Sequence, residues 1–84
     1  MASRFIVYGR TSCPFCKMAL DILDQFDMQK VFFDFTEDQD AIEEAKRFYD
    51  WNTVPMILEN DINTGETKFI GGFDDLRRRF RSEL

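Results

Sequence analysis

Residues 4–26 read RFIVYGRTSCPFCKMALDILDQF, and this stretch decides the fold. Its first six residues are mostly apolar, β-branched or aromatic and end at a glycine, which is typical of a short buried strand. After them, apolar side chains recur at three- and four-residue steps, which predicts a helix from Pro14 to about Phe26. Proline suits the first turn of a helix, because the backbone N–H that it lacks would have no partner there. The stretch therefore predicts a strand that leads through a short loop into a helix.

The rest of the sequence continues this alternation of strands and helices. Residues 31–35 form a second short β-type run, and Thr36-Glu37-Asp38-Gln39 has the pattern of a capping box that opens a helix ending near Tyr49. Two more strand candidates, at residues 55–58 and 67–70, are joined by a turn rich in Asn, Asp, Thr and Gly, which indicates a hairpin. The second helix is predicted to place Ile42, Ala45, Phe48 and Tyr49 on one side.

A last helix follows the hairpin. Gly71 and Gly72 end the fourth strand, and Asp74 and Asp75 place negative charge at the start of this helix, where the macrodipole favours it. The predicted order is strand, helix, strand, helix, strand, strand, helix. The first two strands and their crossover helix form a βαβ unit, and the hairpin completes a four-stranded mixed sheet. We therefore expect an α/β fold in one domain covering residues 1–84.

Composition and charge argue against several classes of protein. The chain has 84 residues, of which 44% are hydrophobic and 15% aromatic, a profile typical of one small globular domain. The net charge of −5 argues against a nucleic-acid binder, which needs a positive footprint. No apolar run approaches the ~20 residues of a membrane-spanning helix, and residues 1–4 lead into a strand without the apolar region of a signal peptide. We expect a cytoplasmic monomer that binds neither nucleic acid nor membrane.

The chain has no histidine and only two cysteines, Cys13 and Cys16. These counts exclude a Ser-His-Asp triad, a Cys-His dyad and a histidine-ligated metal within one chain, and a four-cysteine zinc site would need two chains. A disulfide across so short a loop contributes only about 2 kcal/mol through chain entropy. We therefore expect the two cysteines to serve chemistry rather than stability, although they could also pack as small hydrophobic side chains or share a metal between subunits.

The two cysteines lie at the predicted junction between the first strand and the first helix. Cys13 is placed at the helix start, where unpaired N–H groups and the macrodipole favour a thiolate, and Arg10 adds a positive charge nearby. Side chains three residues apart share a helix face, so Cys16 can approach Cys13 and close a disulfide. Because the thiolate is the nucleophile in thiol–disulfide exchange, we expect Cys13 to attack and Cys16, one turn further in, to resolve.

Three motifs follow one another in the chain: Cys13-Pro14-Phe15-Cys16, Thr53-Val54-Pro55 and Gly71-Gly72-Phe73-Asp74-Asp75-Leu76. With these motifs in this order, the chain resembles a dithiol glutaredoxin, within the thioredoxin-like fold, over nearly its whole length. Its Gly-Gly-Phe sequence is similar to that of some phage glutaredoxins. A thioredoxin proper is less similar, since it usually carries Trp-Cys-Gly-Pro-Cys and a longer chain.

The resemblance implies a binding groove for glutathione. In the family, the proline corresponding to Pro55 is cis and lies opposite the cysteines, so that the backbone of Val54 can pair with the cysteinyl part of glutathione as a short added strand. Arg10 stands in the place of a basic residue that pairs with the glycyl carboxylate. Phe73 and Asp74 stand in the place that holds the γ-glutamyl end. The implied glutathione-binding set is Arg10, Thr53, Val54, Pro55, Gly72, Phe73 and Asp74.

The chain departs from the family pattern just before Thr53. Many glutaredoxins carry Arg or Gln there, whereas this chain has Trp51-Asn52, and Asn52 can donate only a neutral hydrogen bond. This departure predicts weaker glutathione binding or a site that Trp51 covers in a different way. Side chains that could also line the groove are Tyr8, Thr11 and Phe15. The C-terminal arginines are read as a solvated helix face that matches the macrodipole, with docking of an acidic protein as the alternative.

The resemblance implies a thiol–disulfide oxidoreductase that uses glutathione as its reductant. In this reading Cys13 and Cys16 reduce disulfides in proteins and mixed disulfides with glutathione, and ribonucleotide reductase is an implied protein substrate. Three alternatives stay open: a thioredoxin-like redoxin reduced by a flavoprotein reductase, a carrier in which two chains and two glutathiones hold a [2Fe–2S] cluster, and a binding module without redox activity. Pro14 argues against the cluster, because cluster-binding members of the family typically have a smaller or more flexible residue there.

Overall fold

A computed structural model describes residues 3–81, and its elements follow the predicted order. The expectation drawn from the first residues about a signal peptide falls partly on Met1 and Ala2, which lie outside the described residues. The predicted single domain likewise extends beyond them at both ends. The elements are β1 (Ser3–Gly9), α1 (Pro14–Gln25), β2 (Gln29–Asp34), α2 (Gln39–Tyr49), β3 (Met56–Asp61), β4 (Thr67–Gly71) and α3 (Phe73–Arg81).

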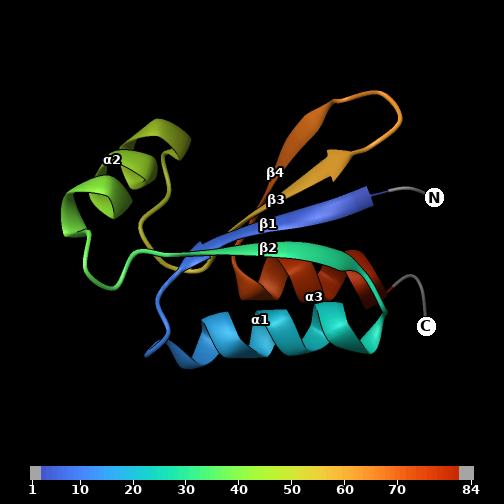
Figure 1. The fold of residues 1–84 in the computed structure, drawn as a ribbon, viewed down its shortest axis with the longest axis horizontal. Helices are drawn as coiled ribbons and strands as arrows, with labels where there is room; N and C mark the ends of the chain where they lie inside the picture. The colour runs from blue at the N-terminus through green and yellow to red at the C-terminus, as the bar shows by residue number, and fades with distance from the viewer. Residues whose placement is uncertain (1–2, 82–84) are drawn as a thin grey trace.

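The four strands form one mixed sheet in the order β2-β1-β3-β4. β1 is parallel to β2 and antiparallel to β3, and β3 is antiparallel to β4. Figure 1 shows α1 and α3 side by side along one face of the sheet, with α2 on the opposite side near the end of β1. This arrangement confirms the predicted four-stranded mixed sheet with flanking helices. Among residues 3–81, no helix is long and apolar enough to cross a membrane.

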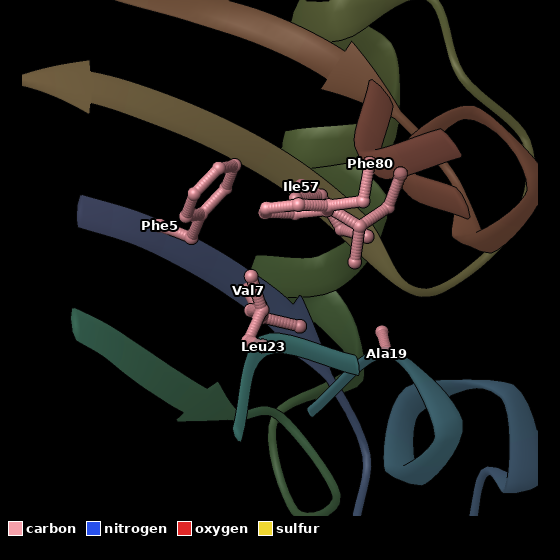
Figure 2. Close-up of a cluster of buried hydrophobic side chains, with 7 residues drawn as sticks. Phe5, Val7, Ala19, Leu23, Ile57 and Phe80 are labelled. Carbon is pink, nitrogen blue, oxygen red and sulfur yellow. The ribbon is translucent and has the colours of Figure 1, made fainter. Parts of the chain in front are cut away.

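The hydrophobic core lies between the sheet and the pair α1 and α3 (Figure 2). Because side chains alternate along a strand, Phe5 and Val7 of β1 point into this layer and are fully buried. The helices contribute apolar side chains at three- and four-residue steps, which places them on the face that meets the sheet. The core consists of Phe5, Val7, Ala19, Leu23, Ile57, Leu76 and Phe80.

The opposite face of the sheet is covered less completely. Tyr8 of β1 lies 5.6 Å from the ring of Phe35, and Tyr49 of α2 stacks at 4.8 Å on Phe69 of β4. These aromatic contacts join α2 to the sheet. Of the apolar residues predicted to share one side of α2, Ile42 is buried, whereas Phe48 is 79% exposed. Phe48 packs edge-on only against its neighbour Tyr49 in this aromatic layer, and so remains at the surface.

The start of α2 also differs from the prediction. The carboxylate of Asp38 accepts a hydrogen bond from the backbone N–H of Ala41 at 3.1 Å, which makes Asp38 the N-cap. Thr36, the expected first residue of a capping box, instead donates its backbone N–H to Asp34 at 3.0 Å. The hydroxyl of Thr36 also receives the backbone N–H of Thr11 at 3.3 Å, so this residue ties the loop before α2 to the loop before α1.

Candidate active site

The first cysteine lies at the start of α1, as the sequence predicts. Cys13 is the N-cap residue, and its sulfur accepts a hydrogen bond from the backbone N–H of Cys16 at 3.2 Å. The local sequence explains this position, because Pro14 is the first residue of the helix. Proline lacks a backbone N–H, and an N–H at that position would have no partner within the helix. Cys13 is half-buried, so this residue is held at the helix start and is also partly exposed.

The second cysteine lies one turn further into α1 and is only 1% exposed. Burial raises the pKa of the Cys16 thiol from its ordinary value of 9.0 to about 12. A side-chain hydrogen bond with Cys13 contributes to this rise, whereas a backbone hydrogen bond at Arg10 and the positive charge of that residue act against it. Cys16 is therefore a protonated thiol at neutral pH, hydrogen-bonded to Cys13. Neither cysteine is in a disulfide, so the structure shows the reduced dithiol.

Gly9, the last residue of β1, makes room for the buried cysteine. A Cβ atom at this position would lie 2.4 Å from the Cys16 sulfur and 3.3 Å from the ring of Phe32. Such a distance is far inside van der Waals contact, so any larger residue would have to displace the sulfur. In the sequence pattern Gly9 marks only the end of a strand, because a strand pattern does not reveal a close approach by a residue from the next helix.

The opposite wall of the site is the segment before β3. The Val54–Pro55 peptide bond is cis, as the family resemblance implies. The Cys13 sulfur lies 3.8 Å from the backbone carbonyl oxygen of Val54, to which a thiol can donate. This contact joins residues that are 41 positions apart in the chain and places the Thr53-Val54-Pro55 motif directly beside the first cysteine.

A groove of about 290 Å³ continues from this wall to the start of α3. It is lined by Phe15, Trp51, Thr53, Val54, Pro55, Gly72, Phe73, Asp74 and Asp75. The groove therefore brings together six of the seven residues predicted to bind glutathione. The seventh, Arg10, does not line it.

The start of α3 is held by an acid that the sequence analysis did not single out for this role. The carboxylate of Asp75 accepts a hydrogen bond from the backbone N–H of Gly72 at 2.9 Å. Gly71 has a φ of +123°, and a Cβ atom there would lie 2.5 Å from the Asp75 carboxylate, so this turn needs glycine. Asp74, the predicted ligand residue, remains exposed and lies 3.5 Å from the guanidinium of Arg77. The two acids thus have separate roles, one structural and one at the groove surface.

Arg10 lies on the other side of the dithiol. Its Nη2 donates to the side-chain oxygen of Gln39, the first residue of α2, at 2.8 Å. Its Nε is buried and has no hydrogen-bond partner among residues 3–81. No sequence signal could have predicted the contact with Gln39, because the two residues are 29 positions apart. The contact fixes a positive charge near the cysteines.

Trp51, from the Trp51-Asn52 pair that departs from the family pattern, lines the groove. Its ring meets Phe69 edge-on at 5.4 Å and lies over Gly72, where a Cβ atom would be 3.6 Å away. Its indole N–H is buried and has no acceptor within the part of the chain that the structure describes. Phe15 lines the groove as expected, 5.8 Å from the ring of Phe73. Tyr8 lies instead in the aromatic layer beneath α2.

Within residues 3–81, no three histidine, cysteine, aspartate or glutamate side chains gather as ligands for a metal ion. The arrangement is that of two thiols, one accessible and one buried, beside a groove with an aromatic wall and an acidic end. Such a pair can attack a disulfide and then close one of its own.

Comparison with known proteins supports this interpretation of the site. The family model described as Glutaredoxin matches residues 5–61. Among solved structures, a buckwheat glutaredoxin–glutathione complex is 24% identical with a TM-score of 0.76, covering 96% of this chain and 71% of the other. The holo form of glutaredoxin C1 from Populus tremula x tremuloides is 22% identical with a TM-score of 0.77, covering 99% and 73%. A glutaredoxin from Brucella melitensis is 26% identical with a TM-score of 0.69, covering 95% and 79%. No curated protein sequence matches the chain.

Proposed function

Because the chain belongs to the glutaredoxin family, whose members are thiol oxidoreductases, we propose that it reduces disulfides with electrons from glutathione. The observation that carries this proposal is the unequal pair of cysteines. Cys13 is accessible at a helix start, and Cys16 is buried beneath it as a protonated thiol. A dithiol arranged in this way can reduce a substrate disulfide and form a disulfide between its own two cysteines.

The first step is attack of the Cys13 thiolate on one sulfur of a substrate disulfide. A bond forms between Cys13 and that sulfur, the substrate disulfide breaks, and the other sulfur leaves as a thiolate that takes a proton from water. The Cys16 thiol then loses its proton and attacks Cys13. This second exchange releases the remaining substrate thiol and leaves a Cys13–Cys16 disulfide, so two electrons have passed from the protein to the substrate.

Two glutathione molecules would restore the dithiol and leave as one glutathione disulfide. The groove next to Cys13 fits a short peptide, since it brings the half-buried Val54 together with a helix start at Phe73 and an exposed carboxylate at Asp74. Asp74 would hold an ammonium group, and Arg10 would face a carboxylate from the other side of the dithiol. Disulfide-containing proteins, with ribonucleotide reductase among those implied by the resemblance, are the proposed macromolecular substrates.

The identity of the electron donor distinguishes this proposal from the alternative of a redoxin that is reduced by a flavoprotein reductase. Oxidised protein would be supplied with NADPH and either glutathione plus glutathione reductase or thioredoxin reductase alone, with bis(2-hydroxyethyl) disulfide as the substrate. We expect NADPH consumption to need glutathione. Consumption supported by thioredoxin reductase alone would contradict the proposal, as would a [2Fe–2S] absorption spectrum in anaerobically purified protein that shows no reductase activity.

A further inference from the structure

The apolar surface beside Cys13 continues along α1, away from the glutathione groove. Phe15, Met18, Ile22 and Gln25 are spaced so that they share one face of the helix. Phe15 is 55% exposed and Met18 is 43% exposed, which is unusual for large apolar side chains next to each other on a small domain. The catalytic steps proposed above give no role to Met18 or Ile22, and glutathione is too short to cover them.

This stripe leads to a cavity between the far ends of α1 and α3, which lie side by side (Figure 1). The cavity has a volume of about 330 Å³, and its lining residues are Ile22, Gln25, Phe26, Arg77, Phe80 and Arg81. Its floor is aromatic, because Phe26 and Phe80 stack at 4.7 Å. Among the lining residues, the two arginines of α3 are the charged ones.

Arg77 and Arg81 are one helical turn apart and form a basic edge along the cavity. Arg77 lies 3.5 Å from Asp74, but both side chains are more than half exposed, so this ion pair is weak. Arg81 makes no ion pair within residues 3–81. The whole protein has a net charge of −5, which makes this edge a positive region on an acidic molecule. Charge complementarity therefore favours a negatively charged occupant.

We infer that this surface binds an acidic segment of the protein substrates, and that an apolar side chain of the segment fills the cavity. The surface is formed by Phe15, Met18, Ile22, Phe26, Arg77 and Arg81. The inference rests on the proposed function, since the substrate cysteine must lie at Cys13. Ile22 and Phe26 are roughly 14–20 Å along the helix from Cys13, at about 1.5 Å per residue. An extended chain covers about 3.3–3.6 Å per residue, so about four to six residues separate the substrate cysteine from the apolar anchor.

Binding can be tested without any turnover. Isotope-labelled protein would be titrated with a cysteine-free peptide, Ser-Gly-Ser-Gly-Ser-Leu-Glu-Asp-Glu, and with the same peptide ending in Leu-Lys-Lys-Lys, while amide NMR signals are recorded. We expect the acidic peptide to shift the signals of residues 22–26 and 77–81, with smaller shifts at high salt because the charges are exposed. Absence of these shifts, or equal shifts with the basic peptide, would overturn the inference.

Turnover provides a second test with matched variants. The same two peptides, with cysteine in place of the first serine and glutathione attached as a mixed disulfide, would serve as substrates. We expect kcat/KM to be about 3- to 10-fold higher for the acidic peptide, a size typical of exposed charge pairs. Arg81→Glu should abolish this preference. Lys68→Glu, an equal charge change at an exposed residue of β4, should retain it.

The small-substrate reaction separates this inference from the proposed function. Both variants should reduce bis(2-hydroxyethyl) disulfide as fast as the wild-type protein, because this substrate is too short to extend from Cys13 to the cavity. A wild-type protein that reduces no disulfide with glutathione would contradict the proposed function, while the peptide titration would still decide whether the docking surface exists. Equal loss of the acidic-peptide preference in both variants would overturn the inferred docking surface but would leave the proposed function unaffected.

Discussion

The dithiol site has two regions with different surroundings, although their cysteines are only three residues apart. We call them the mouth, formed by Cys13 and Val54, and the floor, formed by Gly9, Cys16 and Phe32. At the mouth, the Cys13 sulfur accepts a backbone N–H at 3.2 Å and lies 3.8 Å from the Val54 carbonyl oxygen. At the floor, the Cys16 sulfur is packed against a strand that leaves no room for a Cβ atom. Cys13 is thus half-buried at the start of the helix, whereas Cys16 is buried beneath it.

This difference shows how one helix can carry two thiols with separate tasks. The helix start supplies the backbone N–H that donates to the Cys13 sulfur, and the next turn places Cys16 in the core, where burial favours the neutral thiol. The proposed roles of the two cysteines therefore rest on the depth at which each of them lies. Changes at the mouth should affect attack, and changes at the floor should affect packing and resolution.

The largest expected effect is loss of the mouth sulfur. Cys13→Ser should reduce all disulfide-exchange activity by at least about 100-fold, since the accessible nucleophile is gone and Cys16 is buried. NADPH consumption coupled to glutathione reductase would measure it, with both small and protein disulfides as substrates. Activity within a few-fold of the wild-type rate would mean that the two regions are not distinct.

Filling the floor should destabilise the protein. Gly9→Ala places a methyl group where the Cys16 sulfur lies, and overpacking of this kind typically costs about 1–3 kcal/mol of unfolding free energy. Urea unfolding under reducing conditions would measure this cost. In a Gly9→Ala/Cys16→Ala double variant the clash with the sulfur is removed, so the two costs should not add. Additive costs would show that the close contact does not limit this position.

A charge change beside the mouth should have a moderate effect on glutathione. Arg10→Glu replaces a guanidinium that Gln39 holds near the cysteines with a carboxylate. We expect the KM for glutathione to rise about 3- to 10-fold while the fold is kept, as is typical for exposed charge pairs. The matched control is Arg47→Glu, the same charge change at an exposed residue of α2. Equal KM values for the two variants would remove Arg10 from the proposed glutathione site.

The smallest expected effect is the contribution of the floor residue Cys16 to the pH dependence of the unfolding free energy. Burial raises the pKa of Cys16 to about 12 from an ordinary value of 9.0, so above that ordinary value the unfolded chain loses this proton before the folded protein does. The stability that this thiol contributes is therefore fully present below about pH 9 and is lost as pH rises toward 12. Urea unfolding of reduced protein between neutral pH and about pH 10.5 should show a steeper decline for the wild type than for Cys16→Ser. Parallel declines would contradict the burial of this thiol.

The sequence predicted most of the fold because its signals are local. Apolar periodicity indicated α1, and Pro14 indicated where that helix begins, so Cys13 could be placed at its start. The start of α2 was less clear, because Thr36 and Asp38 are both good caps. Side-chain bonding to Asp34 and Thr11 draws Thr36 away, and this competition depends on the neighbouring loop.

The parts of the site that the sequence did not reveal depend on contacts between distant residues. Gly9 meets Cys16 across the boundary between a strand and a helix, and Arg10 meets Gln39 at the start of another helix. Trp51 was recognised as a departure from the family, but its position over Gly72 follows from how β4 and α3 bring that glycine beneath it. Such contacts carry no local pattern, so only the structure places them.

The central claim is that Cys13 attacks and Cys16 resolves, and Cys16→Ser tests it most directly. Initial rates would be measured for this variant, with glutathione as the reductant, on a protein disulfide and on a glutathione mixed disulfide. We expect Cys16→Ser to lose protein-disulfide reduction but to retain deglutathionylation, because Cys13 alone can accept the glutathionyl group and a second glutathione can release it. Loss of deglutathionylation in Cys16→Ser, together with its retention in Cys13→Ser, would contradict the account and invert the two roles.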